Sequence, residues 1–474
     1  MSCKGLSEKT CIPPCKYIRT TKRNYCRTSK NKTNVKTALN EVVRKHATQK
    51  ISKMIEESGK FLQVVCEQSG QCLAFGTKTK DILKYFNGFT DFKYVTGNLY
   101  SIGENGNNGF VRKIEYDRNG YKAFSILKSS NEPSADNLMY EYLVGTQFIN
   151  HVMLRFPCFI QTYGLFFYEN DDMYQWISQR PEDMPAKSIL QKALKLSHVN
   201  YAKACKDALY ASILIQYISH STTFTDTIIK GGLPYIQYHI TYVIFILYQA
   251  LSSLSKVYTH YDLHSLNVLI FQPYKEKFIQ YIYHMENETI SFKCPYIPKI
   301  IDYGRSFFDN GTFSSKDIYE KVLGTPECKG SGDQFGFGWL NPEEMMTMSA
   351  YKKNESHDLR LMYRLNEKIR IYKSRIHAEK YKKSHSYRRM EKVLSRLQYG
   401  VSLPLYDKMY GTKEDTTLHP RGNIVSNVTD MYNETKKIIM TESVILENDR
   451  FHTMPVGGIL HVYENGNPME FIRI

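Results

Sequence analysis

The sequence predicts an α+β protein in which a strand-rich front part is followed by a helix-rich back part. Short extended runs broken by Gly and Asn occupy residues 94–128, which is typical of a twisted antiparallel sheet. Residues 235–258 are mostly apolar on all sides, which predicts a long buried helix. Helical patterns then dominate, including one or two long basic helices at 358–400. This order predicts two lobes.

The other elements follow from hydrophobic periodicity. Residues 35–55 and 134–154 carry apolar side chains at helical spacing, so both are predicted to be helical. Dense apolar runs predict buried strands at residues 158–168, 212–218, 268–271 and 298–301. Near the C-terminus, two apolar runs flank Asn465-Gly466, a pair typical of hairpin turns, so residues 457–474 are predicted to form a β-hairpin.

The net charge of +16 is spread unevenly along the 474 residues. It is concentrated in residues 1–60 and 351–400, and the remainder of the chain is slightly acidic. Such basic blocks are compatible with nucleic acid, an anionic membrane surface, acidic protein partners, or simply a solvated helix face. No signal peptide opens the chain, and its most apolar run is too short to span a bilayer. We therefore expect a soluble protein that is not secreted.

The ten cysteines fall into two groups. Four lie within the first 26 residues, namely Cys3, Cys11, Cys15 and Cys26. They lack paired C-x-x-C knuckles, so both a zinc site and two disulfides remain open. The others are scattered through the predicted core and are expected to be free thiols, as is common in reducing compartments: Cys66, Cys72, Cys158, Cys205, Cys294 and Cys328.

One stretch between the predicted buried helix and the next strand carries side chains suited to phosphoryl transfer. It reads His260-Tyr261-Asp262-Leu263-His264-Ser265-Leu266-Asn267, and Asp302-Tyr303-Gly304 follows the strand predicted at 298–301. A carboxylate at Asp262 can orient a hydroxyl group and accept its proton. Asn267 and Asp302 offer hard oxygen ligands of the kind that Mg²⁺ prefers.

These segments resemble the two central motifs of protein kinases. H-Y-D-L-H-S-L-N resembles the H-R-D-L-x-x-x-N catalytic loop, and D-Y-G resembles D-F-G, in the same order along the chain. The resemblance implies a two-lobed kinase-like fold, with an antiparallel sheet and one helix in the N-lobe and a mainly helical C-lobe. It also implies ATP, Mg²⁺ or alternatively Mn²⁺, and a protein substrate. Asp262 would be the base, and Asn267 and Asp302 the metal ligands.

The front part supplies matching residues for the nucleotide. Gly103, Gly106, Gly109 and Val111 resemble the glycine-rich loop that lets backbone N–H groups approach phosphates, although the first glycine is displaced by one position. A Gly/Asn hairpin turn would show the same pattern. Lys128 follows a strand-like run, as does the lysine of V-A-I-K that contacts the α and β phosphates.

Two further contacts are implied by the same resemblance. Glu141, on the next predicted helix, is expected to pair with the strand lysine, with Glu132 as the alternative. Residues 214–218 would form the segment that presents backbone groups to adenine, and we assign Gln216 and Ile218 to this role. Farther along the chain, Asp358 is expected to bond back to the catalytic loop as structural support.

The sequence departs from the family pattern at several positions. Tyr261 stands where the catalytic loop usually has arginine, so a phosphorylated activation loop cannot be bound there in the usual way. His264 replaces the loop lysine, and either contacts the γ-phosphate when protonated or forms a local hydrogen bond. Residues 272–298 form a tyrosine-rich insertion, which is expected to be an extra hairpin or loop.

The overall pattern resembles divergent kinase-like proteins of large nucleocytoplasmic DNA viruses, which implies a location in the host cytoplasm or the virion. The predicted parts are a basic, cysteine-rich and helical extension (1–60), a linker (61–93), an N-lobe (94–218), a C-lobe with basic helices at 351–400 (219–440) and a hairpin tail (441–474).

The leading functional prediction is an ATP-dependent serine/threonine protein kinase. The first alternative is a catalytically weak kinase-like scaffold of the virion whose basic segments bind nucleic acid or acidic virion proteins. The second is a small-molecule kinase, for which His264 is the main support.

Overall fold

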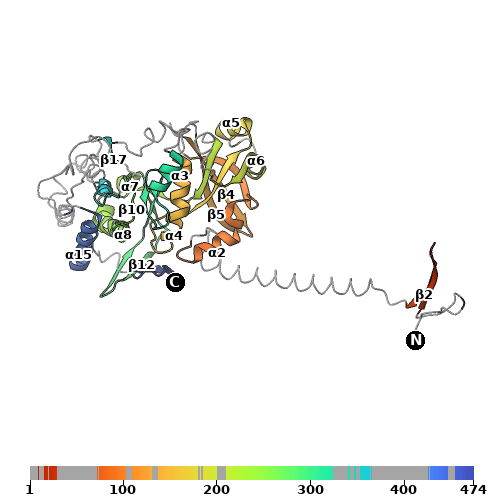
Figure 1. Cartoon of the computed structure of the whole chain (residues 1–474). Coiled ribbons are helices and arrows are strands. Elements are labelled where there is room, and N and C mark those ends of the chain that lie inside the picture. Colours follow the sequence, from red (N-terminus) through yellow and green to blue (C-terminus); the bar gives the residue numbers. More distant parts are fainter. Residues whose placement is uncertain are drawn as a thin grey trace. The chain divides into compact units, whose positions relative to one another are not determined.

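The computed structural model divides the chain into two units, Met1–Val64 and Val65–Ile474. It describes residues 9, 15–19, 21–28, 72, 74–102, 109–130, 137–179, 182, 185–199, 210–323, 340–341, 346–347, 353–362, 365, 425, 427–446 and 454–474. In the first unit, strands β1 (Cys15–Arg19) and β2 (Asn24–Thr28) pair as an antiparallel hairpin (Figure 1). Cys3, Cys11 and the helix predicted at 35–55 lie outside the described residues, so the zinc and disulfide alternatives stay open.

The largest sheet of the second unit is antiparallel throughout and has the strand order β3-β4-β5-β8-β6-β7. It confirms the sheet predicted at 94–128 and the later apolar strands, except that β6 begins at Thr162 and not at residue 158. The strands are β3 (Val95–Ser101), β4 (Gly109–Arg118), β5 (Tyr121–Ser130), β6 (Thr162–Tyr168), β7 (Leu194–Ser197) and β8 (Ala211–Gln216).

Helices cover both faces of this sheet. On one face, Arg112 donates from Nε to the Ile177 carbonyl of α5 (Asp171–Gln179), and Tyr116 packs against Phe89 of η2 (Asn87–Phe89). Helices α2 (Lys78–Tyr85) and α6 (Ala186–Ala193) complete the elements of the front part. The opposite face carries Lys128 and meets the helix predicted at 134–154, which consists of α3 (Asn137–Val144), a π-helical turn (Gly145–Ile149) and α4 (Asn150–Val152).

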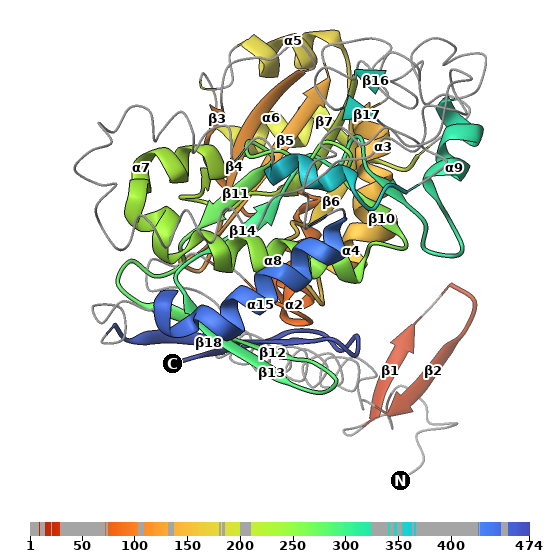
Figure 2. The same ribbon diagram turned by 90° about the vertical axis from the view of Figure 1, so that its left-hand side faces the viewer.

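The long helix predicted at 235–258 is divided in two. Helix α7 (Phe224–Tyr238) ends before His239, whose φ of −124° interrupts the helix, and α8 (Ile240–Ser253) then begins. The prediction of burial is confirmed, because every residue from Ile240 to Leu251 is buried. Figure 2 shows α15 (Val428–Leu446) alongside α8. Apolar composition alone could not show the break, since both halves have the same pattern.

Short strands follow α8. The predicted strands are confirmed as β11 (Val268–Phe271) and β14 (Ile297–Ile300), which pair with each other, and β11 also pairs with β9 (Thr222–Thr223). Strands β10 (Tyr258–Thr259) and β15 (Phe307–Phe308) form a second antiparallel pair. The later described elements are α9 (Ser315–Ile318), a π-helical turn (Tyr319–Leu323), β16 (Leu340–Asn341), β17 (Met346–Thr347) and η8 (His357–Leu359).

The insertion and the C-terminal tail join in one four-stranded sheet, ordered β13-β12-β18-β19. The insertion forms the predicted hairpin from β12 (Phe278–His284) and β13 (Thr289–Cys294), and the tail forms the predicted hairpin from β18 (Val456–Tyr463) and β19 (Glu470–Arg473). Strands β12 and β18 pair in parallel, which the sequence did not predict. The ring of Phe292 stacks on Tyr242 of α8, so this sheet shares the main core.

Two expectations need correction. Cys72 is disulfide-bonded and is not a free thiol, whereas Cys158 and Cys294 are free and buried as predicted. Apolar neighbours suit a thiol and a disulfide equally, so the sequence could not separate the two. In the basic block at 351–400, residues 354 and 356–362 are buried, which contradicts a solvated face there, and most of the block lies outside the described residues. Within the described part of the chain, no helix is long and apolar enough to cross a membrane.

Candidate active site

Two loops with the predicted polar residues lie side by side because strand pairs anchor both of their ends. The loop at 260–267 connects β10 to β11, and the loop at 301–306 connects β14 to β15. Since β10 pairs with β15 and β11 pairs with β14, each loop is held against the other. The Ile301 N–H also donates to the Asn267 carbonyl at 3.0 Å. The β12–β13 hairpin, which is inserted between β11 and β14, does not interrupt the pairing of these two strands.

Asp358 fixes the backbone of the first loop, as predicted. Its carboxylate accepts hydrogen bonds from the N–H groups of His260 at 2.8 Å and Tyr261 at 3.1 Å. Burial raises the pKa of Asp358 to about 7, and the two N–H donors oppose that shift. The His260 Nε2 donates to the Ile301 carbonyl at 3.0 Å, which ties the two loops together. Burial lowers the pKa of His260 to about 4, so its imidazole is neutral near pH 7.

Tyr261 is a buried anchor of the first loop. Its ring centroid lies 5.0 Å from that of His357, and burial raises its pKa well above the ordinary value. Its φ is +61°, a left-handed conformation that is uncommon for a bulky residue. Asp302 in the second loop has a φ of +66°. Backbone strain of this kind persists where surrounding contacts over-determine the conformation, and it is frequent at functional sites.

Lys128 connects three separate parts of the chain. It lies on β5 directly opposite Val111 of β4. Its Nζ is 2.6 Å from Glu141 Oε2 on α3 and 2.8 Å from Asp302 Oδ1 in the second loop. Burial by itself lowers the pKa of Lys128, but the Asp302 and Glu141 carboxylates outweigh it and hold this pKa above its ordinary value. Lys128 is therefore a fixed cation.

The two carboxylates that bind Lys128 differ in their surroundings. Lys128 holds the pKa of Asp302 down at about 2, so Asp302 is ionised at neutral pH. Glu141 is buried, and burial raises its pKa while Lys128 opposes that shift. Tyr140 next to it donates from its hydroxyl to the Ser306 carbonyl at 2.5 Å, which ties α3 to the chain that follows Asp302. The position of Glu141 thus depends on the second loop.

Asp262 is held by two arginines. Arg360 Nη1 lies 2.8 Å from Asp262 Oδ1, and Arg305 Nη1 lies 3.3 Å from Oδ2. His264 Nε2 is 3.8 Å from Oδ1. The His264 Nδ1 accepts the Leu266 N–H at 3.2 Å, which agrees with the predicted local hydrogen bond. The Asp262 carboxylate therefore has cationic or polar partners on both oxygens.

Asn267 is oriented by its amide nitrogen. Its Nδ2 donates to the Asp262 carbonyl at 3.0 Å, which leaves the side-chain oxygen as the group available for a ligand. Together with the Asp302 carboxylate, this oxygen makes a hard donor pair suited to Mg²⁺. Among the described residues, no group of three or more His, Cys, Asp or Glu side chains is arranged to hold a metal ion.

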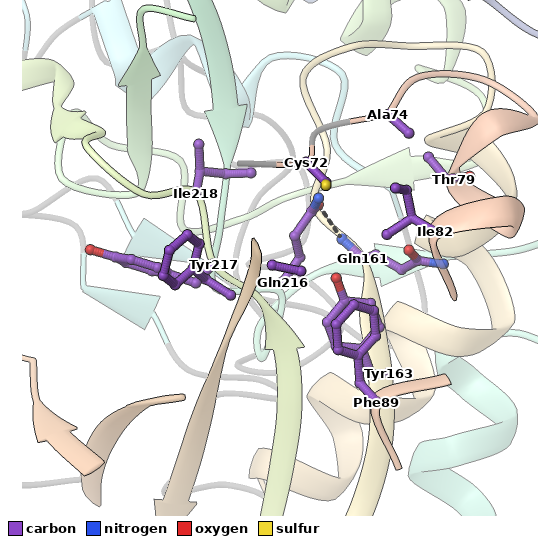
Figure 3. Close-up of a pocket in the computed structure, with 12 residues that line it drawn as sticks. Cys72, Ala74, Thr79, Ile82, Phe89, Gln161, Tyr163, Gln216, Tyr217 and Ile218 are labelled. Carbon is purple, nitrogen blue, oxygen red and sulfur yellow. Dashed lines mark hydrogen bonds between the residues drawn. The ribbon is translucent and has the colours of Figure 1, made fainter. Parts of the chain in front are cut away.

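Several predicted binding residues do not join this cluster. Gly103 and Gly106 lie outside the described residues, while Gly109 begins β4. Gln216 and Ile218 line a cavity of about 20 Å³, which has room for roughly one water molecule (Figure 3). The charged residues around Lys128 and Asp262 do not line this cavity. Gln216 pairs with Ser125, which places both on the sheet face opposite Lys128. The Gln216 N–H is already used, donating to the Gln161 carbonyl at 2.7 Å.

Arg305 and Arg360 are the site residues that the sequence analysis did not assign. Arg305 directly follows Asp302-Tyr303-Gly304, and Arg360 lies two residues after Asp358. Both positions adjoin quoted motifs, so a search for cations next to the predicted carboxylates would have found them. Their partner in each case lies far away in the sequence, and no local pattern reveals it.

The site places cationic side chains next to carboxylate and amide oxygens. It combines a fixed lysine, two further cations and three acidic or amide oxygen donors on two adjoining loops. No model of a known protein family matches the chain, and no curated protein sequence matches it.

Proposed function

We propose that this chain is an ATP- and magnesium-dependent phosphotransferase, specifically a serine/threonine protein kinase. The proposal rests on one observation: the Lys128 ammonium contacts two carboxylates simultaneously, Glu141 at 2.6 Å and Asp302 at 2.8 Å. Asp262 and Asn267 stand on the loop beside Asp302. A fixed lysine, a metal-binding carboxylate and a loop carboxylate are the parts that phosphoryl transfer to a hydroxyl requires.

The proposed architecture is a kinase-like fold of two lobes. The six-stranded sheet with α3 corresponds to the N-lobe, which contributes Lys128 and Glu141. Helices α7 and α8 with the two loops correspond to the C-lobe, which contributes Asp262, Asn267 and Asp302. The ion pair between Lys128 and Asp302 would then span the two lobes at the nucleotide site.

Each side chain has a defined task in this proposal. Lys128 binds the α and β phosphates of the nucleotide, and Glu141 holds it in place. Asp302 and the Asn267 oxygen fit a magnesium ion, because both are hard donors and the Asn267 nitrogen is committed elsewhere. Bound Mg²⁺ would offset negative charge on the phosphates. Asp262 would orient the acceptor hydroxyl and take its proton.

A protein acceptor suits the surface around Asp262. Leu266, one residue before Asn267, is 55% exposed even though it lies within the loop. An exposed leucine on the same loop as Asp262 would offer an apolar contact for a peptide side chain.

One observation favours the scaffold alternative. Both carboxylate oxygens of Asp262 are bound by arginine side chains, so neither oxygen is free to contact an acceptor hydroxyl in this conformation. A catalytically weak protein would retain nucleotide binding through Lys128 and lose only transfer. The two functions therefore differ in turnover and not in affinity.

The test is incubation of the purified chain with γ-labelled ATP and a mixture of acidic and basic protein substrates, with Mg²⁺ and Mn²⁺ compared. The kinase proposal predicts metal-dependent labelling on serine or threonine, abolished by Asp262→Asn. Nucleotide binding without labelling would support the scaffold. The absence of both binding and labelling would exclude the kinase and leave a scaffold that acts through its basic segments.

A further inference from the structure

Arg305 contacts Asp262 and acts electrostatically on Asp302. Its guanidinium lies 3.3 Å from Asp262, and its charge also helps to lower the pKa of Asp302. It therefore acts as a counter-ion to both carboxylates.

The two arginines on Asp262 are not equivalent. Arg360 is 4% exposed and makes the shorter contact at 2.8 Å, so breaking it would leave a buried charge without its partner. Arg305 is 29% exposed and makes the longer contact at 3.3 Å. Partly exposed ion pairs contribute little free energy, so Arg305 can exchange its partner readily. Its contact with Asp262 is the one that a ligand can replace.

The backbone also permits such an exchange. The Ser306 N–H donates to the Tyr303 carbonyl at 3.0 Å, which places Arg305 within a tight turn. A side chain at a turn can move while Tyr303, whose hydroxyl accepts the Ile160 N–H at 3.0 Å, stays fixed. Asp302 would therefore keep its position when Arg305 moves.

His264 is poorly suited to contact a phosphate as a cation. Its Nδ1 accepts a hydrogen bond from the Leu266 N–H, and protonation of Nδ1 would turn this acceptor into a donor and break the bond. Arginine, in contrast, is always charged and presents a planar fork of donors that matches a phosphate group.

We propose that Arg305 is a phosphate-binding residue that exchanges Asp262 for the terminal phosphate of the bound nucleotide. The inference rests on the proposed function, since it needs a nucleotide next to Lys128. In the free protein, Arg305 pairs with Asp262, whereas in the complex it releases Asp262 toward the acceptor hydroxyl. The same movement couples the presence of a terminal phosphate to the freeing of the proton acceptor.

The proposal is tested by the ratio of affinities for a non-hydrolysable ATP analogue and ADP, measured by calorimetry at saturating Mg²⁺. Loss of one charge-assisted contact is expected to reduce the preference for the ATP analogue about tenfold in Arg305→Ala, while ADP affinity changes by less than about threefold. Arg305→Lys, which keeps the charge but not the fork, should give an intermediate ratio. Lys275→Ala, an exposed site away from the two loops, is the control and should match wild type.

Each other outcome overturns the inference. An unchanged ratio in Arg305→Ala, an equal loss of affinity for both nucleotides, or a wild-type protein without a preference for the ATP analogue would each exclude the exchange. A wild type that binds neither nucleotide would instead exclude the proposed function on which the inference rests. If thermal unfolding shows that Arg305→Ala does not fold, the ratios for Arg305→Lys and Arg305→Gln decide by the same criteria.

Discussion

Arg360 binds the carboxylate of Asp262 at 2.8 Å although the two residues are 98 positions apart in the sequence. The same short segment contains Asp358, which accepts the N–H groups of His260 and Tyr261. Residues 357–360 thus hold the loop twice, once by its backbone and once by the side chain of Asp262. The conformation of this loop is therefore a tertiary property and not a local one.

Removing Arg360 should destabilise the protein far more than removing Arg305. Arg360→Ala leaves the mostly buried Asp262 charge without its main partner, which is expected to lower the free energy of unfolding by about 3–5 kcal/mol. Arg305→Ala breaks a partly exposed pair, with an expected loss of up to about 1 kcal/mol. Urea denaturation of both variants measures the difference. Equal losses would contradict the distinct roles assigned to the two arginines.

Replacing Lys128 with methionine should reduce phosphoryl transfer more than nucleotide binding. The methionine keeps the apolar stem but removes the cation that Glu141 and Asp302 hold. Positioning of the phosphates contributes mainly to the chemical step, so the rate at saturating ATP should fall by about 100-fold or more. The matched control is Lys122→Met on the same strand, which removes a 2.7 Å pair with Glu115 far from the two loops. Similar rates for the two variants would count against the site.

The contribution of His260 to stability should decline as the pH falls from about 6.5 toward 4. His260 has a folded-state pKa of about 4, below its ordinary value of 6.5, because burial disfavours its charged form. Its contribution is thus complete above pH 6.5 and is lost as the pH falls through the folded pKa. His260→Gln, which can still donate to the Ile301 carbonyl, should show a shallower decline in urea denaturation across this range.

Asp358 titrates in the opposite sense, so the comparison must be between variants. Its raised pKa of about 7 gives stability that is complete below its ordinary value of 3.8 and is lost as the pH rises toward 7. Subtracting the His260→Gln curve from the wild-type curve removes this shared contribution. His239→Gln is the control, because His239 is also buried with a pKa of about 4 and lies outside the two loops. His239→Gln should also make the decline of stability with falling pH shallower, but it should not change the rate of phosphoryl transfer.

Gly109→Ala should disturb the strand pair that positions Lys128. Gly109 has a φ of +149°, and a Cβ there would lie 2.0 Å from the Ser129 carbonyl oxygen. Backbone strain alone is expected to lower the free energy of unfolding by about 1–3 kcal/mol, and the steric clash adds to this loss. Gly120→Ala is the control, since Gly120 has a φ of +82° but no atom within 4 Å of the added Cβ. Thermal or urea unfolding that ranks Gly120→Ala as the more damaging change would refute the clash.

The sequence could place Asp262, Asn267 and Asp302 on two neighbouring loops because the local spacing and the flanking strands are visible in it, while the chemical roles of these residues stay predictions. Asp262 and Asn267 share one loop, Asp302 lies two residues after strand β14, which pairs with β11 at the end of that loop, and Asp358 belongs to a segment quoted from the sequence. The antiparallel sheet was predictable for a similar reason, since its alternating burial and its Gly and Asn turns are local signals.

Other features depend on contacts between distant residues. The parallel pairing of β12 with β18 joins His284 to His461 across 177 positions, and neither strand carries a signal for the other. Arg360 falls within the basic block at 351–400, where composition gave it no role in the site, yet it is buried against Asp262. The break at His239 was hidden because apolar residues continue on both sides of it.

The central claim is that Asp302 serves phosphoryl transfer, and the most direct measurement compares wild type with Asp302→Asn using γ-labelled ATP and Mg²⁺. The substitution keeps the size of the side chain but removes the charge that binds Lys128 and would hold the metal. We predict that wild type labels a protein substrate and that Asp302→Asn retains less than about 1% of this rate while remaining folded. Asp171→Asn, at an exposed residue of helix α5, should behave as wild type. Equal labelling by wild type and Asp302→Asn, or a folded wild type that neither binds ATP nor transfers its phosphate, would contradict the account.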